Sequence, residues 1–545
     1  MNPNHVPFSQ LNTLDIASQK PLSKVRVKYP KFVKNVQIDH YHFYQKDFFP
    51  DLKKLKPLAK AVQKLAIKLT SMGKNSQACF RRTTANLKNF RLAKKVSLVC
   101  STVFIVPDHE IMMILRQMKA LKQLKHIHVN FLNSFLTPKS IALIYGFRSI
   151  PSVESLVLKL PKARRMQSKP SQALKRVYKR FGESKRLKKK LKDFEVTIDN
   201  DEDTTLSLKT SKNTSSALDE EYISILKYLN NIEKLKLNFG NKVLSKLSKD
   251  FMKYLENLSQ LKALGLRFNN EVLDPNDLDE MYKVIQFLNL SSLELKVCSK
   301  QIINSGLCET LNKLSGLKIL KLELRHNQLL YDDFQRLIKS FSLLKSLEYF
   351  TLKWDLVSNK PTPDFYLQIF NSFMQRAQHL KVLDINYSSG ELNQNEINWL
   401  VDNIGSMKKL KSFGITAKRI HREVTEKSLK QLFSYLKHLT GLNKLKLNFF
   451  YSHEMQSATG ALIKSIKKLD NLEKLIVYCP YTNQQKSEVL DFYNSLQQNS
   501  SIKVIRIDLP YFEELKYLIK SKPRKLIIKS VYWDFSYRVI YDLYF

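Results

Sequence analysis

The residues best suited to chemistry in this chain are two pairs of histidines, each pair separated by a single residue. The first pair is His40 and His42, and the second is His126 and His128. On a β-strand, residues i and i+2 lie on the same face, so each pair has the spacing to chelate a metal ion. No cysteine or carboxylate nearby in the sequence completes a zinc-binding set, however. We therefore interpret both pairs as polar wall residues, and we expect no metal or other cofactor.

The sequence also lacks the motifs of common catalytic sites. It contains no P-loop, G-x-G-x-x-G loop, kinase signature, G-x-S-x-G elbow or H-E-x-x-H helix. Only 12 of the 545 residues are glycine, which disfavours glycine-rich phosphate loops. The cysteines form no C-x-x-C pair and are expected to be buried free thiols: Cys79, Cys100, Cys298, Cys308 and Cys479. We therefore do not expect an enzyme, and a hydrolase or transferase is the weakest of the functions considered.

The net charge of +42 is the compositional feature that bears most directly on function. Such a field favours polyanionic partners, namely RNA, DNA, acidic proteins or membrane surfaces. The first residues lack the charged and apolar regions of a secretory signal, and no window approaches about 18 uninterrupted apolar residues. We therefore expect no transmembrane segment and an intracellular location, either cytoplasmic or nuclear, and not a secreted protein.

A repeated pattern, apolar-x-x-apolar-x-apolar, organises the chain and must position any functional side chain. In the clear copies, the second apolar residue is Leu235, Leu264, Leu293, Leu322, Phe350, Leu383, Phe413, Leu445, Leu475 and Ile505. Fainter copies centre on Val36, Leu65, Val96, Ile127, Leu156 and Phe194, and a final copy is Leu526-x-Ile528. Most steps are close to thirty residues, which a random distribution of leucine does not produce. The sequence therefore predicts about seventeen stacked units.

Each unit combines two periodicities. The apolar-x-apolar segment alternates with period two, which predicts a short strand with one buried face. The residues between strands recur at helical spacing, as in Val284, Phe287 and Leu288 and again in Leu429, Leu432 and Phe433. One strand and one helix cannot bury their apolar faces alone, so the copies must stack into a continuous core. Because helices are wider than strands, we expect the stack to curve, with parallel strands inside and helices outside.

The repeat resembles that of the leucine-rich-repeat family, specifically its ribonuclease-inhibitor-like branch with long, helix-bearing repeats. The signature L-x-x-L-x-L-x-x-N/C is complete at 261–269 and 290–298 and, with Ile319 leading, at Asn327. The resemblance implies an α/β solenoid, or horseshoe, with parallel strands on the concave face and helices on the convex face. It also implies that function lies on the concave surface. The ninth position departs from the family's pattern at Gly240, Ser388, Lys418, Phe450, Pro480 and Pro510, so those turns must be satisfied in another way.

Composition and repeat spacing divide the chain into five segments. They are an N-terminal cap at 1–32, degenerate repeats at 33–160, an elaborated repeat with a basic helical segment and an acidic Ser/Thr-rich loop at 161–220, regular repeats of about 30 residues at 221–510, and a C-terminal repeat with an aromatic cap at 511–545.

The strand positions between the core residues are rich in basic side chains. The candidate binding residues on the concave face are Lys234, Lys236, Arg267, Lys296, Lys321, Arg325, Lys353, Lys444, Lys446, Lys474 and Arg506, and Lys64, Lys68 and Lys159 occupy similar positions. Acids are fewer there: Asp39, Asp193, Glu195, Glu294, Glu323, Asp384 and Asp508. These positions form either a groove for an acidic protein partner or an ordinary solvated surface in a lysine-rich protein. Few aromatic residues lie among them, which disfavours a base-stacking platform for nucleic acid.

A second basic feature is the segment 162–192, with fourteen Lys or Arg residues against Glu183 alone. Its candidate polyanion-binding or targeting residues are Lys185, Arg186, Lys188, Lys189, Lys190 and Lys192. This run is compatible with a nuclear-import signal, a helix that contacts RNA or DNA phosphates, a helix on anionic lipid, or a solvated helix face. An acidic and Ser/Thr-rich stretch follows, up to residue 216, and is the best candidate for disorder and phosphorylation.

The sequence therefore favours a non-enzymatic scaffold that binds a protein partner, of acidic character if the lysines take part, through a mildly basic concave face. The alternative is an RNA- or DNA-associated protein that uses the segment 162–192 and the overall positive field. The oligomeric state does not follow from the sequence.

Overall fold

The protein is described from a computed structural model. The described residues are 13–17, 35–42, 61–71, 87–100, 108–131, 143–144, 147, 150, 152–161, 192–199, 226, 231–239, 249–268, 275–298, 305–327, 331–356, 365–373, 379–449, 455–478, 501–502, 504–508, 527–534 and 537–544. The chain forms two compact units, unit 1 at Met1–Leu288 and unit 2 at Asn289–Phe545. Both units are built from the same kind of repeat.

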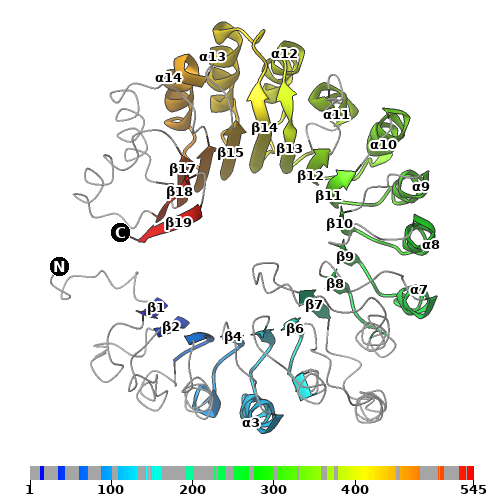
Figure 1. Ribbon diagram of the computed structural model, residues 1–545, viewed down its shortest axis with the longest axis vertical. Helices are drawn as coiled ribbons and strands as arrows, with labels where there is room; N and C mark the ends of the chain where they lie inside the picture. Colours follow the sequence, from blue (N-terminus) through cyan, green and yellow to red (C-terminus); the bar gives the residue numbers. More distant parts are fainter. Residues whose placement is uncertain are drawn as a thin grey trace, which may run out of the picture. The chain divides into compact units, whose positions relative to one another are not determined.

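Unit 1 is a ladder of parallel strands. In chain order these are β1 (Thr13–Ala17), β2 (Asn35–His42), β3 (Lys64–Ser71), β4 (Lys95–Cys100), β5 (His126–Asn130), β6 (Ser155–Pro161), β7 (Asp193–Asp199), β8 (Lys234–Phe239) and β9 (Ala263–Phe268). Each strand pairs in parallel with the next. The helices α3 (Asp108–Lys119), α7 (Lys249–Glu256) and α8 (Pro275–Ile285) connect strands and lie on one side of the ladder (Figure 1). Because β1 pairs with β2, the ladder begins inside the segment expected to be an N-terminal cap.

Unit 2 repeats the arrangement. Its parallel strands are β10 (Ser292–Cys298), β11 (Ile319–Asn327), β12 (Tyr349–Leu356), β13 (Val382–Leu392), β14 (Ser412–Ile420), β15 (Lys444–Phe449), β16 (Lys474–Tyr478), β17 (Val504–Asp508) and β18 (Ile527–Asp534). The helices between them are α9 (Ser305–Lys313), α10 (Tyr331–Leu343), α11 (Phe365–Phe373), α12 (Gln394–Asn403), α13 (Glu426–Tyr435) and α14 (Met455–Ile466). The last strand, β19 (Tyr537–Tyr544), pairs with β18 in the antiparallel sense and ends the ladder.

The core lies between the strands and the helices, as the alternating pattern predicts. The strand residues Leu264, Leu293 and Leu383 are almost fully buried, and Leu429 and Phe433 of α13 pack into the same layer. Repeated burial of this kind is the main stabilising contribution in a solenoid, because each unit shares its apolar surface with its neighbours.

One predicted core residue is wrong. Phe287 was expected on the buried helical face with Val284 and Leu288, but 80% of its surface is exposed. The reason is that α8 ends at Ile285, so the helical spacing no longer governs the direction of Phe287 in the following turn. The prediction for α13 is confirmed, because its three apolar residues are all buried.

The register of two strands also differs from the predicted one. Leu320, and not Leu322, aligns with Leu293 on β10 and with Phe350 on β12. In the same way Ile528, and not Leu526, aligns with Ile505. Both differences are shifts of two residues, which leave the same side chains on the same face because strands have period two. The signature that begins with Ile319 is therefore placed two residues too far along the chain. The face of the strand that it assigns to the core is correct.

Neighbouring repeats are joined by a hydrogen-bond arrangement that recurs in both units. The carbonyl of Gln63 accepts bonds from the backbone N–H groups of Lys94 (2.8 Å) and Lys95 (3.1 Å). The carbonyl of Lys411 does the same for Asn443 (2.8 Å) and Lys444 (3.0 Å). Many of the described strands, from β4 to β16, therefore begin with N–H groups bonded to a carbonyl of the preceding repeat, which fixes their register.

The helix layer of unit 2 contains a buried carboxylate that joins two repeats. Asn393 and Glu396 form a capping box at the start of α12, with side-chain to backbone distances of 3.0 Å and 2.9 Å. The other oxygen of Glu396 accepts a bond from the N–H of Leu367 in α11, at 3.4 Å. The same group thus satisfies backbone donors of two successive helices.

We expect Asn393→Ala to lower the free energy of unfolding by about 1 kcal/mol, because it removes the N-cap acceptor and leaves the N–H of Glu396 unsatisfied. Urea denaturation measures this change. The matched control is Asp402→Ala at an exposed position of the same helix, which should alter stability by less than about 0.5 kcal/mol. Equal effects of the two substitutions would contradict the role given to the cap.

Candidate binding surface on the strand face

The structure places all eleven predicted concave-face residues on strands. Lys234, Lys236 and Arg267 lie on β8 and β9 of unit 1, and the other eight lie on β10, β11, β12, β15, β16 and β17 of unit 2. Where side-chain burial is described, they alternate with buried core residues, so they project from the face opposite the helices. We call this face of the ladder the strand face.

In unit 2, part of the expected positive charge is neutralised by acids on the same face. Glu323 lies between two lysines, with its carboxylate oxygens 3.6 Å from Nζ of Lys296 and 3.6 Å from Nζ of Lys353. The strand register explains the arrangement, because these three residues are aligned on neighbouring strands. Such pairing lowers the local potential that these two lysines offer to an anionic partner.

A second carboxylate compensates two further lysines. Asp384 on β13 lies 3.3 Å from Nζ of Lys446 and 3.8 Å from Nζ of Lys444, both on β15. The strand between them, β14, carries Gly414 at the aligned position. A Cβ there would lie 2.6 Å from Oδ1 of Asp384, so the carboxylate occupies the space that a side chain would take. Burial lowers the pKa of Lys446 from its ordinary value, while the negative charge of Asp384 opposes that shift.

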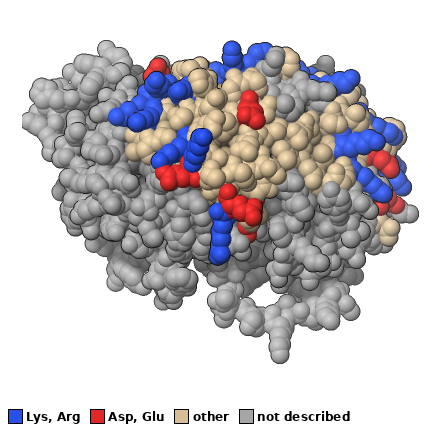
Figure 2. All heavy atoms as spheres, turned by 90° about the horizontal axis from the view of Figure 1, so that it is seen from above, with Lys and Arg blue, Asp and Glu red and all other residues tan. Residues whose placement is uncertain are grey.

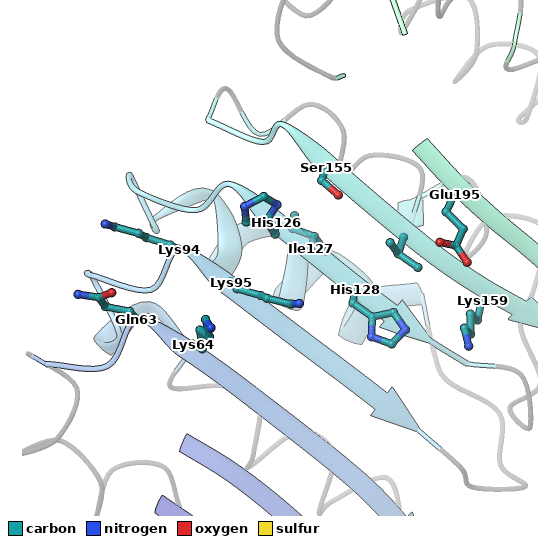
Figure 3. A pocket seen from close by; sticks show the side chains of 11 residues that line it. Gln63, Lys64, Lys94, Lys95, His126, Ile127, His128, Ser155, Lys159 and Glu195 are labelled. Carbon is teal, nitrogen blue, oxygen red and sulfur yellow. The ribbon is translucent and has the colours of Figure 1, made fainter. Parts of the chain in front are cut away.

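Unit 1 presents a different arrangement, a shallow cavity of about 630 Å³ on the strand face of β3 to β7 (Figure 3). Its charged lining consists of Lys64, Lys94, Lys95 and Lys159 together with one carboxylate, Glu195. The side chains of Lys64, Lys95 and Lys159 form no ion pair in the described part of the chain. Four lysines against one carboxylate therefore make this cavity positively charged, and three of these lysines lack the ion pairs seen in unit 2 within the described residues.

His128 is a half-buried titratable side chain of the cavity lining. Its Nδ1 shares a hydrogen bond of 3.0 Å with the hydroxyl of Ser97 on the neighbouring strand, and its Nε2 has no partner among the described residues. Burial lowers the pKa of His128 below its ordinary value of 6.5, and the positive charges of Lys159 and Lys95 lower it further. Near neutral pH the ring is therefore uncharged.

The structure gives the histidine pairs no metal-binding surroundings where it describes them. His126 and His128 lie on the same face of β5, as predicted, and the cavity that they line also contains Lys64, Lys94, Lys95 and Lys159, which repel a cation. Within the described residues no group of three or more potential metal ligands occurs. His40 and His42 lie on β2, and their side chains fall outside the description.

Sequence reasoning did not identify the unit 1 cavity as a site. Lys64 and Lys159 were recognised only as members of a long series, and Lys95 and Ser97 were not singled out. A signal was present, because successive repeats begin their strands with Lys64, Lys95 and His126. The parallel register then brings these positions side by side.

The predicted basic segment 162–192 lies outside the described residues except for its last member. Lys185, Arg186, Lys188, Lys189 and Lys190 are therefore not placed, and neither is the acidic stretch that follows. Lys192 is exposed and forms an ion pair with Glu233 at 3.1 Å. An exposed pair of this kind contributes little to stability.

The surface of unit 2 around α12 and α13 carries both kinds of charge. Figure 2, seen from the side of α12 and α13, shows Lys and Arg together with Asp and Glu among uncharged residues. Cys100 and Cys308 are buried and take part in no disulfide. Among the helices that the structure describes, none has the length and apolar character to cross a membrane.

Comparison with protein-family models and with curated proteins finds no match. Two solved structures are similar at 14% sequence identity. One is the crystal structure of a TLR13–ssRNA13 complex, with a TM-score of 0.34 over 96% of this chain and 62% of that chain. The other is the crystal structure of the Rad7 and Elc1 complex in yeast, with a TM-score of 0.35 over 83% of this chain and 87% of that chain. This chain thus spans less than two thirds of the first of these proteins.

The fold itself is defined by the chain's own strand ladder. A parallel strand recurs about every thirtieth residue in most of the chain, its apolar residues are buried, and helices cover one side. This is an α/β leucine-rich-repeat solenoid.

Proposed function

We propose that this protein is a non-enzymatic scaffold that binds an acidic protein partner through its strand face. The observation that carries the proposal is a set of lysines on the strand faces of the two units that form no ion pair among the described residues, namely Lys64, Lys95 and Lys159 in unit 1 and Lys321 in unit 2. Fixed positive charges on a rigid surface favour an acidic partner, because they speed association and disfavour basic competitors.

The ribonuclease-inhibitor-like branch and the five-segment division are further parts of this proposal. The helices α9 to α14 that separate the strands of unit 2 support long, helix-bearing repeats. The aligned residues Leu156, Phe194 and Leu235 are separated by 38 and 41 residues, which supports an elaborated repeat at 161–220. The remaining boundaries follow from composition and repeat spacing.

The test is charge reversal on the strand face. We expect Lys64→Glu combined with Lys321→Glu to abolish most capture of acidic proteins from an extract of the native cell, measured by affinity purification and mass spectrometry. The matched control is Lys119→Glu combined with Lys409→Glu, which reverses the same number of exposed lysines, one in each unit, off the strands. The control should capture the same proteins as the wild type.

Equal losses in both variants would contradict the strand face as the binding surface. Two results together would favour the nucleic-acid alternative. The protein would be retained on RNA in a salt-sensitive way, and this retention would be lost when four residues are changed to Gln: Lys185, Arg186, Lys188 and Lys189. Protein capture would be unchanged in the Lys64/Lys321 variant.

A further inference from the structure

The unit 1 cavity brings hydrogen-bond donors and positive charge together from four neighbouring strands. The register aligns Lys64 of β3 with Lys95 of β4, and Lys95 with His126 of β5. Lys159 on β6 lies beside Asn130, two residues after His128. Figure 3 shows these side chains around one hollow, with that of Lys95 extending along its strand toward His128.

His128 belongs to the lining of the cavity and carries a buried ring nitrogen without a partner among the described residues. Ser97 is aligned with His128 on the neighbouring strand, and its hydroxyl lies 3.0 Å from Nδ1. When Ser97 donates to Nδ1, the neutral ring carries its proton on Nε2, the atom without a partner among the described residues. Nε2 is shielded from solvent, so an anion reaches it only when a neighbouring side chain of the lining moves, and a buried donor gains more from such a bond than from remaining unpaired.

We propose that this cavity binds a phosphate group carried by a phosphorylated segment of the protein partner. The inference rests on the proposed function and names the chemistry that the partner presents. A phosphate monoester is nearly a dianion at neutral pH and has three acceptor oxygens, so it can use several ammonium groups and a ring N–H at once. A carboxylate has one charge and two oxygens and leaves more of these donors unused.

The lining also favours a protein over a nucleic acid as the bearer of the phosphate. Apart from the two imidazole rings, the lining residues are lysines, Gln63, Ser155, Glu195 and two aliphatic residues. Proteins that hold single-stranded nucleic acid usually combine a basic groove with aromatic side chains on which bases stack. The cavity has the basic groups without such a platform.

Occupation of the cavity has a spectroscopic consequence at His128. The ring faces Lys95 and Ser97 from β4 and Lys159 from β6, and Glu195 of β7 contributes the one carboxylate of the lining. Burial and the two lysines hold the pKa of His128 below 6.5. A bound dianion opposes both effects, so it raises the pH at which His128 titrates.

The experiment uses the full chain and two probes, inorganic phosphate and a pair of acidic peptides that differ only in one phosphoserine. We expect calorimetry to show that the phosphopeptide binds at least about tenfold more tightly than its unphosphorylated form. Lys95→Gln combined with Lys159→Gln should weaken phosphopeptide binding by roughly tenfold or more for each lysine. The control variant, Lys119→Gln with Lys122→Gln, removes two exposed lysines of unit 1 outside the cavity and should bind like the wild type.

Histidine NMR provides a readout that general charge effects do not reproduce. Inorganic phosphate should raise the titration midpoint of His128 in the wild type and in the control, and should not do so in the Lys95/Lys159 variant. Equal binding of the two peptides, equal weakening by both pairs of substitutions, or an unmoved His128 midpoint would overturn the phosphate site. Thermal melting of each variant checks that the fold is intact.

The same variants separate this inference from the proposed function. If captured proteins stay bound after phosphatase treatment, the phosphate inference fails and the scaffold role stands. If phosphopeptide binding depends on Lys95 and Lys159 but no protein is captured, the phosphate site stands and the proposed function fails. If a single-stranded RNA binds with the same dependence on Lys95 and Lys159, and the two peptides bind equally well, the assignment to a protein partner is overturned.

Discussion

Leu293→Asp is expected to lower the free energy of unfolding by about 4 kcal/mol or more, the largest effect among the substitutions considered. Leu293 has none of its surface exposed, and its aligned neighbour Leu320 is equally buried. An aspartate there must either hold an unpaired charge in an apolar layer or take up a proton, and both outcomes are costly. Because repeats of a solenoid stabilise one another, the loss should extend to the adjacent repeats.

Urea denaturation followed by circular dichroism measures this effect. The matched control is Leu343→Asp, because Leu343 is also an apolar residue of unit 2 but 41% of its surface is exposed. The control should change the free energy of unfolding by less than about 1 kcal/mol. Identical denaturation midpoints for Leu293→Asp and the wild type would show that Leu293 does not belong to the core.

Gly414→Ala is expected to lower the free energy of unfolding by about 1–3 kcal/mol, although alanine normally suits a strand better than glycine does. The new Cβ would lie 2.6 Å from Oδ1 of Asp384, so this carboxylate must move. Lys446, only 14% exposed, then loses its closest carboxylate. A largely buried ammonium without its partner is unfavourable, so the effect exceeds that of the steric contact alone.

A double-mutant cycle isolates this cause. In an Asp384→Ala background the space beside Gly414 is open, and Gly414→Ala should then cost less than about 1 kcal/mol. Gly460→Ala in α14 is the control, because nothing lies within 4 Å of its Cβ and alanine is the better helix former. An equal cost of Gly414→Ala in both backgrounds would assign its effect to the backbone and not to the ion pair.

The sequence was sufficient to predict the repeat, the strand face and most of the core, because hydrophobic periodicity determines which side chains point inward. It was not sufficient for the register of β11. Leu317, Leu320, Leu322 and Leu324 are all buried, so the apolar pattern can be placed at two positions that differ by two residues. Only the backbone hydrogen bonds of Lys318 and Ile319 to the carbonyl of Ser291 decide between them. Phe287 shows the same limit at the end of α8. The helix ends at Ile285, whereas the apolar residues continue in the sequence, so helical periodicity does not predict the direction of Phe287.

The charged surface was less predictable than the core. A count of lysines along the strands treats Lys296, Lys446 and Lys64 as equivalent, although the first two are paired with carboxylates and the third has no such pair among the described residues. Those pairings join residues from different repeats, and the one between Asp384 and Lys446 spans two strands above a glycine. Local sequence patterns carry no information about such distant partners. The cavity of unit 1 was missed for the same reason, since it exists only when five strands are aligned.

The paired backbone hydrogen bonds at the starts of these strands determine which insertions and deletions a chain of stacked repeats can tolerate. In many of the described strands the first two backbone N–H groups donate to a carbonyl of the repeat before, as those of Glu473 and Lys474 do to Asn443. Loss or duplication of one whole repeat preserves every such bond, because the next strand meets an equivalent carbonyl. Loss of half a repeat leaves a helix where a strand is required. Gene duplications and deletions near thirty codons should therefore be tolerated, whereas those near fifteen should not.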